Sequence, residues 1–168
     1  MFWKFIATGF GSGYSPIAPG TAGALVACAV LWVFHEYWPQ FYGGAESWPE
    51  LLLLIGGFFF LGVKSAGEVE KEWGHDASKI VVDEMVGLWM AMLFVPFSLL
   101  NLGTAFVLFR IFDIWKPLGI RNMEKFNGGW GVMMDDVLAG GYSLVVMHLW
   151  LMLKDGVLVQ RFIGVAAG

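Results

Sequence analysis

Residues 109–140 read FRIFDIWKPLGIRNMEKFNGGWGVMMDDVLAG, and this stretch concentrates charged side chains in a chain that is otherwise mostly apolar. Side chains three or four residues apart are neighbours on a helix, so Arg110, Asp113 and Lys116 are predicted to share one flank of a helix. Pro117 is expected to stop or kink that helix, because proline lacks a backbone donor and clashes with the preceding turn. These charged side chains are the first candidates for chemistry.

Two more carboxylates, Asp135 and Asp136, stand just before the apolar run Val137–Leu153. Glycines at positions 128, 129 and 131 precede them and free the backbone. We therefore expect a loop over Leu118–Met134 and a helix over Val137–Leu153, with both carboxylates where the loop enters the helix.

The composition predicts a small all-α integral membrane protein. The 168 residues are 58% hydrophobic and 14% charged, and the mean hydropathy is +0.68. A water-soluble domain with so little charge would have too few polar side chains to cover its surface. We expect a single domain over residues 1–168 with about four to five apolar helices. The net charge of −4 argues against nucleic acid as a partner, because a phosphate backbone binds basic patches.

The predicted helices follow the apolar runs of the sequence. Three of them are Thr21–Trp38, Leu51–Val63 and Val137–Leu153. The uncharged run Met85–Phe109 is expected to hold a helix, a turn near Ser98–Gly103 and the start of a further helix, Thr104–Lys116. Thr21 is expected to cap the first of them. Leu51–Val63 is short for a membrane span, which needs about 20 residues. Lys64–Asp83 has an amphipathic pattern broken at Gly74, and the tail to Gly168 is expected to add a short amphipathic helix.

The distribution of Lys and Arg predicts an orientation in the membrane. With five crossings and the N-terminus inside, eight of the ten Lys and Arg residues lie inside, and only Lys154 and Arg161 lie outside. This pattern obeys the positive-inside rule. The same topology puts the loop 9–20, the segment 75–84 and the segment 110–136 on one side, so we expect the candidate site to face the cytoplasm.

Two acidic pairs, Asp83-Glu84 and Asp135-Asp136, each precede an apolar helix. Helix capping is one interpretation, because the positive end of a helix dipole favours acidic groups. Capping needs one acid per helix, however, and Asp113 brings the number of carboxylates at the predicted helix ends to five. Uncompensated negative charge there would be costly, and a divalent cation would relieve it. Oxygen ligands alone favour Mg²⁺.

The basic side chains Arg110, Lys116 and Arg121 have two interpretations. Each alone is typical of a cytoplasmic helix anchor, whereas beside a cluster of acids they suit a bound phosphate, which Lys and Arg both bind well. The glycines of the loop 9–20 leave backbone N–H groups free for an anion, although flexibility alone also explains them. His75 and Asp76 are either a base and its partner or a solvated pair in a loop.

Four blocks of the sequence together resemble the bacterial phosphatidylglycerophosphatase A family. They are GSGYSPIAPGTAG from residue 11, IVVDEMVG from residue 80, FRIFDIWKP from residue 109 and GGWGVMMDDVLAG from residue 128. The resemblance implies a helical protein of the bacterial inner membrane with several membrane crossings. It further implies Mg²⁺-dependent removal of the terminal phosphate of phosphatidylglycerophosphate, a phospholipid substrate, which yields phosphatidylglycerol.

The residues and this resemblance together give a hypothesis for the site. The expected Mg²⁺ ligands are Asp83, Glu84, Asp113, Asp135 and Asp136. Arg110 and Lys116 are expected to stabilise charge on the transferring phosphoryl group, and Asp83 or Asp136 to act as general base; a covalent aspartyl-phosphate stays open. The expected substrate contacts are Gly11, Ser12, Ser15, Thr21 and Arg121.

Other functions stay open at this point. A membrane transporter or channel for a divalent cation would also use clustered carboxylates, although a cluster at one membrane face speaks against it. A CDP-alcohol phosphotransferase is another Mg²⁺-dependent lipid enzyme, but its D-G-x-x-A-R and G-x-x-x-D-x-x-x-D pattern is absent from this sequence. A purely structural subunit would have no use for five carboxylates at the helix ends.

Overall fold

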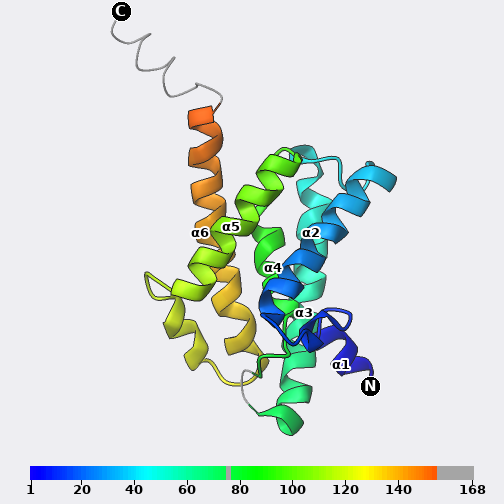
Figure 1. Ribbon diagram of the computed structural model, residues 1–168, viewed down its shortest axis with the longest axis vertical. Coiled ribbons are helices and arrows are strands. Elements are labelled where there is room, and N and C mark those ends of the chain that lie inside the picture. The colour runs from blue at the N-terminus through cyan, green and yellow to red at the C-terminus, as the bar shows by residue number, and fades with distance from the viewer. Residues whose placement is uncertain (75–76, 155–168) are drawn as a thin grey trace, which may run out of the picture.

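The computed structural model describes residues 1–74 and 77–154, without the side chain of Glu124, and its described part consists of helices and connecting loops without strands. The helices are α1 (Phe2–Ala7), η1 (Ser12–Tyr14), α2 (Pro19–Tyr37), η2 (Ala45–Ser47), α3 (Trp48–Trp73), α4 (Val82–Ala91), α5 (Leu99–Trp115), η3 (Ile120–Lys125) and α6 (Gly129–Lys154) (Figure 1). This confirms the predicted all-α class. The pair His75 and Asp76 and the predicted C-terminal helix lie outside the described residues.

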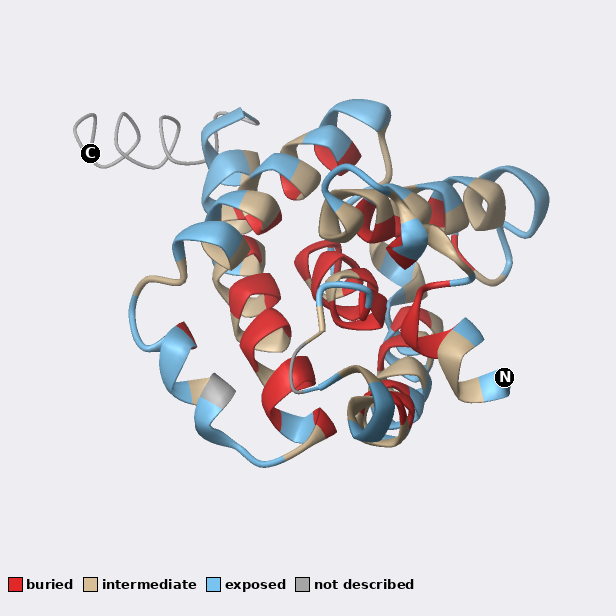
Figure 2. Ribbon diagram, turned by 60° about the horizontal axis from the view of Figure 1, so that its bottom comes forward, coloured by how far each residue is buried: buried red, intermediate tan, exposed pale blue. Residues whose placement is uncertain are grey.

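Helix α4 lies at the centre of the bundle, with α2, α3, α5 and α6 packed around it (Figure 1). Eight of its ten residues are buried, and they lie on all sides of the helix, which is typical of an enclosed element. Figure 2 shows the buried residues gathered on the inner faces of the surrounding helices. The indole Nε1 of Trp89 donates a hydrogen bond to the carbonyl oxygen of Ala27 at 3.1 Å, which ties α4 to α2.

Two glycines let α4 and α6 approach each other closely. A Cβ added at Gly140 would lie 2.9 Å from the Cβ of Met90 and 3.0 Å from the carbonyl carbon of Gly87, both on α4. Small residues at a crossing allow such close backbone contact in membrane proteins. Asp83 and Asp136 each lie four residues before one of these glycines, on the same helix face, so the crossing brings the two carboxylates together.

The start of α2 corrects one prediction. The helix begins at Pro19, with Ala18 as the N-cap residue, so Thr21 lies in the first turn and does not cap it. Proline is favoured at the first position of a helix because its missing N–H would be unpaired there anyway. The Pro-Gly sequence at 19–20 therefore opens the helix.

Helix α3 is longer than predicted. It joins the apolar run Leu51–Val63 to the amphipathic residues that follow and ends at Trp73, so Lys64 begins no new element. The predicted break at Gly74 is confirmed, because Gly74 has φ 88° and follows the last helical residue.

The connection between α4 and α5 falls earlier than predicted. Helix α5 starts at Leu99, and Ser98 caps it by accepting a hydrogen bond from the N–H of Asn101 at 3.0 Å. The Asn101 side chain donates to the carbonyl oxygen of Pro96 at 2.9 Å. Asn101 and Gly103 therefore lie inside the helix instead of forming a turn. The predicted end is confirmed, because α5 stops at Trp115, two residues before Pro117.

The last helix also starts earlier than predicted, at Gly129 instead of Val137. A Cβ at Gly129 would lie 3.0 Å from the Cα of Val63, so this glycine serves close packing against α3. Tertiary packing outweighs the low helix propensity of glycine here. Asp135 and Asp136 consequently lie inside α6, about two turns from its start, and not where a loop enters a helix.

Within residues 1–74 and 77–154, three helical segments are long and apolar enough to cross a membrane: Pro19–Tyr37, Ala45–Trp73 and Gly129–Lys154. These spans agree with the predicted small helical membrane protein. The ten residues of α4 extend only about 15 Å at 1.5 Å per residue, too short for a hydrocarbon core of about 30 Å. Helix α4 is therefore too short to span the membrane by itself, and the count of five crossings stays a prediction.

Candidate active site

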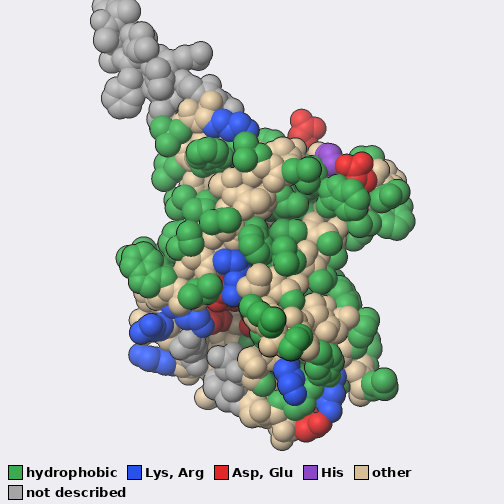
Figure 3. Space-filling model, viewed as in Figure 1, with side chains coloured by type: hydrophobic (Ala, Val, Ile, Leu, Met, Phe, Trp, Pro, Cys, Tyr) green, Lys and Arg blue, Asp and Glu red, His purple; other side chains and the backbone are tan. Residues whose placement is uncertain are grey.

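A polar cavity of about 330 Å³ lies where α2 and α4 begin, α5 ends and the first turns of α6 pass. All five predicted carboxylates line it, together with Arg110 and Lys116, the two basic residues predicted to be catalytic. The full lining is Ala18, Pro19, Gly20, Ser78, Ile80, Asp83, Glu84, Arg110, Asp113, Ile114, Lys116, Asp135 and Asp136. Figure 3 shows acidic side chains set back in a hollow, with basic side chains beside it.

Three of the carboxylates form the centre of the site. Asp83, Glu84 and Asp136 each place one oxygen within 4.8 Å of the others, and only 7% of Asp83 and 3% of Asp136 are exposed. Asp83 Oδ1 and Glu84 Oε2 are buried without a hydrogen-bond partner in the described part of the chain. Unpaired buried carboxylate oxygens this close together fit a divalent cation with oxygen ligands, because such an ion would supply the missing partners.

The electrostatics of the first turn of α4 agree with that fit. Burial raises the pKa of Asp83 well above its usual range, and the negative charge of Glu84 raises it further. Burial also raises the pKa of Glu84. Burial therefore shifts both groups toward the protonated form, whereas a bound cation would favour the charged form.

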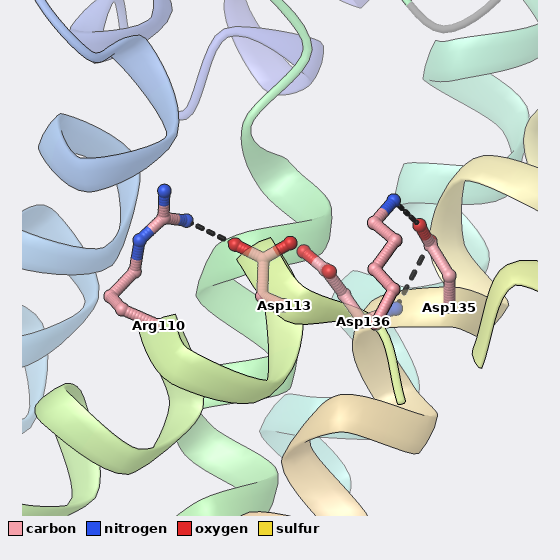
Figure 4. Close-up of polar contacts among 5 residues, drawn as sticks. Arg110, Asp113, Asp135 and Asp136 are labelled. Carbon is pink, nitrogen blue, oxygen red and sulfur yellow. Dashed lines mark hydrogen bonds and ion pairs between the residues drawn. The ribbon is translucent and has the colours of Figure 1, made fainter. Parts of the chain in front are cut away.

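Asp113 and Arg110 form an ion pair within α5, three residues apart, as their spacing predicted (Figure 4). Their side chains are 13% and 17% exposed, so water screens the pair weakly. Figure 4 shows the second oxygen of Asp113 directed toward the carboxylate of Asp136. Arg110 is therefore held at the edge of the carboxylate cluster.

Lys116 and Asp135 form a second ion pair, between the end of α5 and α6. Lys116 Nζ lies 2.6 Å from Asp135 Oδ2, and Asp135 Oδ1 accepts a hydrogen bond from the N–H of Asp136 at 3.0 Å (Figure 4). Lys116 has φ 47°, a left-handed conformation that is costly for a residue other than glycine. This turn of the chain lets the Lys116 side chain reach across to α6.

The five predicted ligands thus divide into two groups. Asp113 and Asp135 are paired with Arg110 and Lys116, whereas the other three predicted ligands face one another. The first group holds the basic side chains in place, and the second offers the concentration of negative charge that a cation needs.

The remaining predicted substrate contacts do not line this cavity. Ser12 and Ser15 donate hydrogen bonds to carbonyl oxygens within their own loop, both at 2.9 Å, and Gly11 adopts φ 99° beside them. Thr21 lies in the first turn of α2, next to the lining residue Gly20, and Arg121 is exposed on η3. The role of these five residues in substrate binding stays a prediction.

Sequence reasoning missed Gly20. A Cβ at this position would lie 3.1 Å from Arg110 Nη1 and 3.2 Å from the carboxyl carbon of Glu84. Only glycine leaves room for these two side chains at the start of α2. In the sequence the Pro-Gly pair ends the predicted loop 9–20, and no pattern there places its glycine beside charged side chains. Ser78 also lines the cavity, and no pattern in the sequence distinguishes it.

Fold and site together define a helical membrane protein with a cluster of three carboxylates that could bind a metal ion and two anchored basic side chains beside it. Comparison with protein families places it more narrowly. The sequence model described as Phosphatidylglycerophosphatase A matches residues 5–151, most of the chain. The chain belongs to the phosphatidylglycerophosphatase A family.

Named relatives agree with this family. A phosphatidylglycerophosphatase A of Escherichia coli is 37% identical over 150 residues, which cover 87% of this chain and 81% of that protein. The phosphatidylglycerophosphatase A of Haemophilus influenzae is 37% identical over 145 residues, 84% of each chain. A Bacteroides thetaiotaomicron protein, named as a candidate phosphatidylinositol-3-phosphatase, is 51% identical over 145 residues, 84% of this chain and 89% of that one. The solved structures include no significant match.

The family confirms the predicted enzyme class, a phosphoric monoester hydrolase of the phosphatidylglycerophosphatase type. A membrane transporter or channel for a divalent cation is disfavoured on the same ground. The position of the three carboxylates agrees, because Asp83 and Glu84 lie in the first turn of α4 and Asp136 within about two turns of the start of α6, so all three lie toward one end of the bundle.

Proposed function

We propose that this protein removes the terminal phosphate of phosphatidylglycerophosphate, with Mg²⁺ as cofactor, and so forms phosphatidylglycerol in phospholipid biosynthesis. One observation carries the proposal: a cluster of three carboxylates and two anchored basic side chains line one cavity. Phosphoryl transfer needs little more from a protein than positioning and charge stabilisation, and this set of side chains supplies both.

Asp83, Glu84 and Asp136 would hold the cation. Their ligand atoms are all oxygens, which favours Mg²⁺ over the metals that prefer His or Cys. A divalent cation at this position supplies Lewis-acid polarisation of the phosphoryl oxygens.

The basic side chains would bind the phosphate group. Arg110 presents a planar guanidinium and Lys116 a point charge, and both are held in place by buried carboxylates. A pre-positioned positive charge stabilises the developing charge of the transition state without reorganisation. The first turns of α2 and α4 also line the cavity, and their positive dipole ends favour an anion.

Asp83 or Asp136 would take the proton of the attacking water. Both are buried at the centre of the cluster, where a carboxylate with a raised proton affinity is a better general base than an exposed one. Asp113 and Asp135 are less suited, because each already forms an ion pair, with Arg110 and Lys116 respectively.

We place the site at the cytoplasmic face of the bacterial inner membrane. The support is the charge distribution, because the helix ends and loops on the side of the site contain five lysines, whereas Lys154 ends α6 on the other side; the five are Lys4, Lys71, Lys79, Lys116 and Lys125. This is the positive-inside pattern.

A second candidate substrate is phosphatidylinositol 3-phosphate, which the name of the 51% identical relative favours. Both lipids carry a phosphate monoester on an alcohol of the headgroup, so the same charged side chains would serve either. The two differ in the headgroup, a flexible glycerol in one and an inositol ring in the other.

The test uses purified protein in detergent micelles, with either lipid as substrate and either Mg²⁺ or EDTA. Phosphate release from phosphatidylglycerophosphate that needs Mg²⁺ and exceeds release from phosphatidylinositol 3-phosphate at least tenfold is expected. The reverse preference would assign the second substrate. Release that EDTA leaves unchanged would refute the role of the carboxylates.

A further inference from the structure

An apolar groove of about 440 Å³ on the outer face of α5 adjoins the candidate active site. It is lined by Phe106, Val107, Arg110, Ile111, Ile114 and Trp115. Arg110 and Ile114 line both the groove and the polar cavity, so the two spaces meet at these residues. Figure 3 shows hydrophobic side chains over α5, beside the hollow that contains the acidic ones.

The groove faces outward from the bundle. Val107, Ile111, Ile114 and Trp115 are between 48% and 71% exposed, and their spacing of i, i+4, i+7 and i+8 forms one helical stripe. A stripe this apolar on a membrane protein meets hydrocarbon, and a tryptophan at its lower end is typical of the boundary with the headgroups. The stripe thus ends at the level of the site.

Arg110 lies at the junction of the two spaces. The guanidinium of Arg110 forms an ion pair with Asp113, which lines the polar cavity. Arg110 also lines the apolar groove. If Arg110 binds a phosphate group, the remainder of the ligand that carries this phosphate would lie close to the apolar stripe, because Arg110 lines both spaces. A phospholipid has the required shape, with a charged headgroup at one end and hydrocarbon at the other.

We propose that an acyl chain of the phospholipid substrate lies in this groove, so that α5 binds the chain while its Arg110 faces the headgroup phosphate. The proposal rests on the proposed function of the site. It makes Val107 and Ile111 determinants of specificity for a lipid over the same headgroup without chains, since both lie one to two turns from Ile114 along the stripe.

A second apolar groove, between α2 and α3, serves as an internal comparison. It has a volume of about 330 Å³ and is lined by Phe10, Val26, Ala29, Val30, Val33, Phe34, Leu54, Phe58 and Trp89. None of these residues lines the polar cavity. A lipid chain in this groove would not adjoin the phosphate site, because the two spaces share no lining residue. What distinguishes the groove on α5 is therefore its contact with the polar cavity and not its hydrophobicity.

The experiment compares phosphatidylglycerophosphate with its deacylated form, glycerophosphoglycerophosphate, in detergent micelles with Mg²⁺. The quantity measured is the lipid preference, the ratio of kcat/KM for the acylated to the deacylated substrate. Ile111→Trp and Val107→Trp would fill the groove, and each is expected to lower this preference tenfold or more, through KM. The matched control Ala29→Phe fills the groove between α2 and α3 at an exposed position and is expected to leave the preference within twofold.

A binding measurement accompanies the kinetics. Phosphatidylglycerophosphate with a photoreactive group in its acyl chain is expected to label residues 106–115, and excess unlabelled substrate should suppress that labelling. Ile111→Ala, which enlarges the groove and adds no bulk, keeps the test decisive if both Trp variants fail to fold. It is expected to shift the preferred chain length toward longer chains.

The outcomes separate the two proposals. Wild-type protein without phosphatase activity on either headgroup would refute the proposed function itself. An active wild type whose lipid preference is unchanged by all three α5 variants, or changed equally by Ala29→Phe, would overturn the groove proposal alone. Loss of a dimer in these variants with an unchanged preference would assign the face to a second copy of the chain and equally overturn it.

Discussion

Replacing Gly140 by alanine is expected to weaken Mg²⁺ binding by moving α6 away from α4. The added methyl group would lie 2.9 Å from the Cβ of Met90 and 3.0 Å from the carbonyl carbon of Gly87, whereas ordinary contact begins at 3.4 Å. Backbone cannot rotate out of the way as a flexible side chain does. The two helices must therefore separate locally by about half an ångström.

The size of the loss in affinity depends on how much distortion of its ligand geometry each cation accepts. Gly140 and Gly87 lie one turn from Asp136 and Asp83, whose oxygens lie within 4.8 Å of each other and of a Glu84 oxygen. Mg²⁺ needs near-ideal octahedral geometry at about 2.0–2.1 Å, whereas Ca²⁺ accepts about 2.3–2.6 Å in flexible arrangements. The overpacking itself costs about 1–3 kcal/mol. We expect Mg²⁺ affinity to fall about tenfold or more, equivalent to about 1.4 kcal/mol, and Ca²⁺ affinity by less than about threefold.

Isothermal titration of the purified protein with each cation measures both affinities, and thermal unfolding without metal measures the packing cost. Gly141→Ala is the matched control, because no described atom lies within 4 Å of a Cβ at that position. Alanine there should leave both affinities unchanged and stabilise the helix by up to about 1 kcal/mol. Equal losses for Mg²⁺ and Ca²⁺ in Gly140→Ala, or a loss in the control, would refute the link between the helix crossing and the cation site.

Three further predictions concern single side chains of the site. Asp136→Asn should lower phosphate release by about 10³-fold or more and abolish the rise in unfolding temperature with Mg²⁺, while the metal-free protein stays folded because one crowded buried charge is gone; a retained Mg²⁺ effect on unfolding would contradict it. Lys116→Met should destabilise the protein by about 3 kcal/mol, because it removes the ion-pair partner of buried Asp135, and the double variant with Asp135→Asn should recover most of that loss in denaturant unfolding. Lowering the pH from 8 to 6 should weaken Mg²⁺ binding in titrations, because burial raises the pKa of Asp83 and protons compete with the ion. The free energy of unfolding of the metal-free protein should instead increase as the pH is lowered. The raised pKa of Asp83 contributes a stabilisation that is complete below about pH 4 and is lost as the pH rises through that pKa. A pH-independent Mg²⁺ affinity would contradict this.

The candidate site was largely predictable because charge is rare in this chain. Among 58% hydrophobic residues, each carboxylate near a predicted helix end stands out, and all five line the same cavity. The spacing of Arg110 and Asp113 also predicted their pairing, since residues three apart on a helix are neighbours whatever the rest of the fold does. Local rules sufficed wherever the interacting groups share one helix.

Helix boundaries were less predictable because glycine has several uses. The glycines at 128–131 suggested a loop, yet Gly129 packs against the backbone of α3 inside a helix. Asn101 suggested a turn, yet its side chain holds the carbonyl oxygen of Pro96 from within α5. Whether such a residue breaks a helix or allows close packing depends on the partner element, which local propensity does not contain.

The sequence also does not reveal which of the five carboxylates pair with basic side chains and which cluster together, because this depends on contacts between helices. Lys116 is close in sequence to Asp113, but the left-handed turn at Lys116 carries its ammonium to Asp135 on the next helix. Had Lys116 continued the helix α5, Asp135 would lack this ion pair. The arrangement of three clustered carboxylates beside two anchored basic side chains therefore depends on one backbone conformation at the end of α5, which the following Pro117 favours by disallowing a further helical residue. The sequence contains that proline, but only the packing of α5 against α6 gives it this consequence.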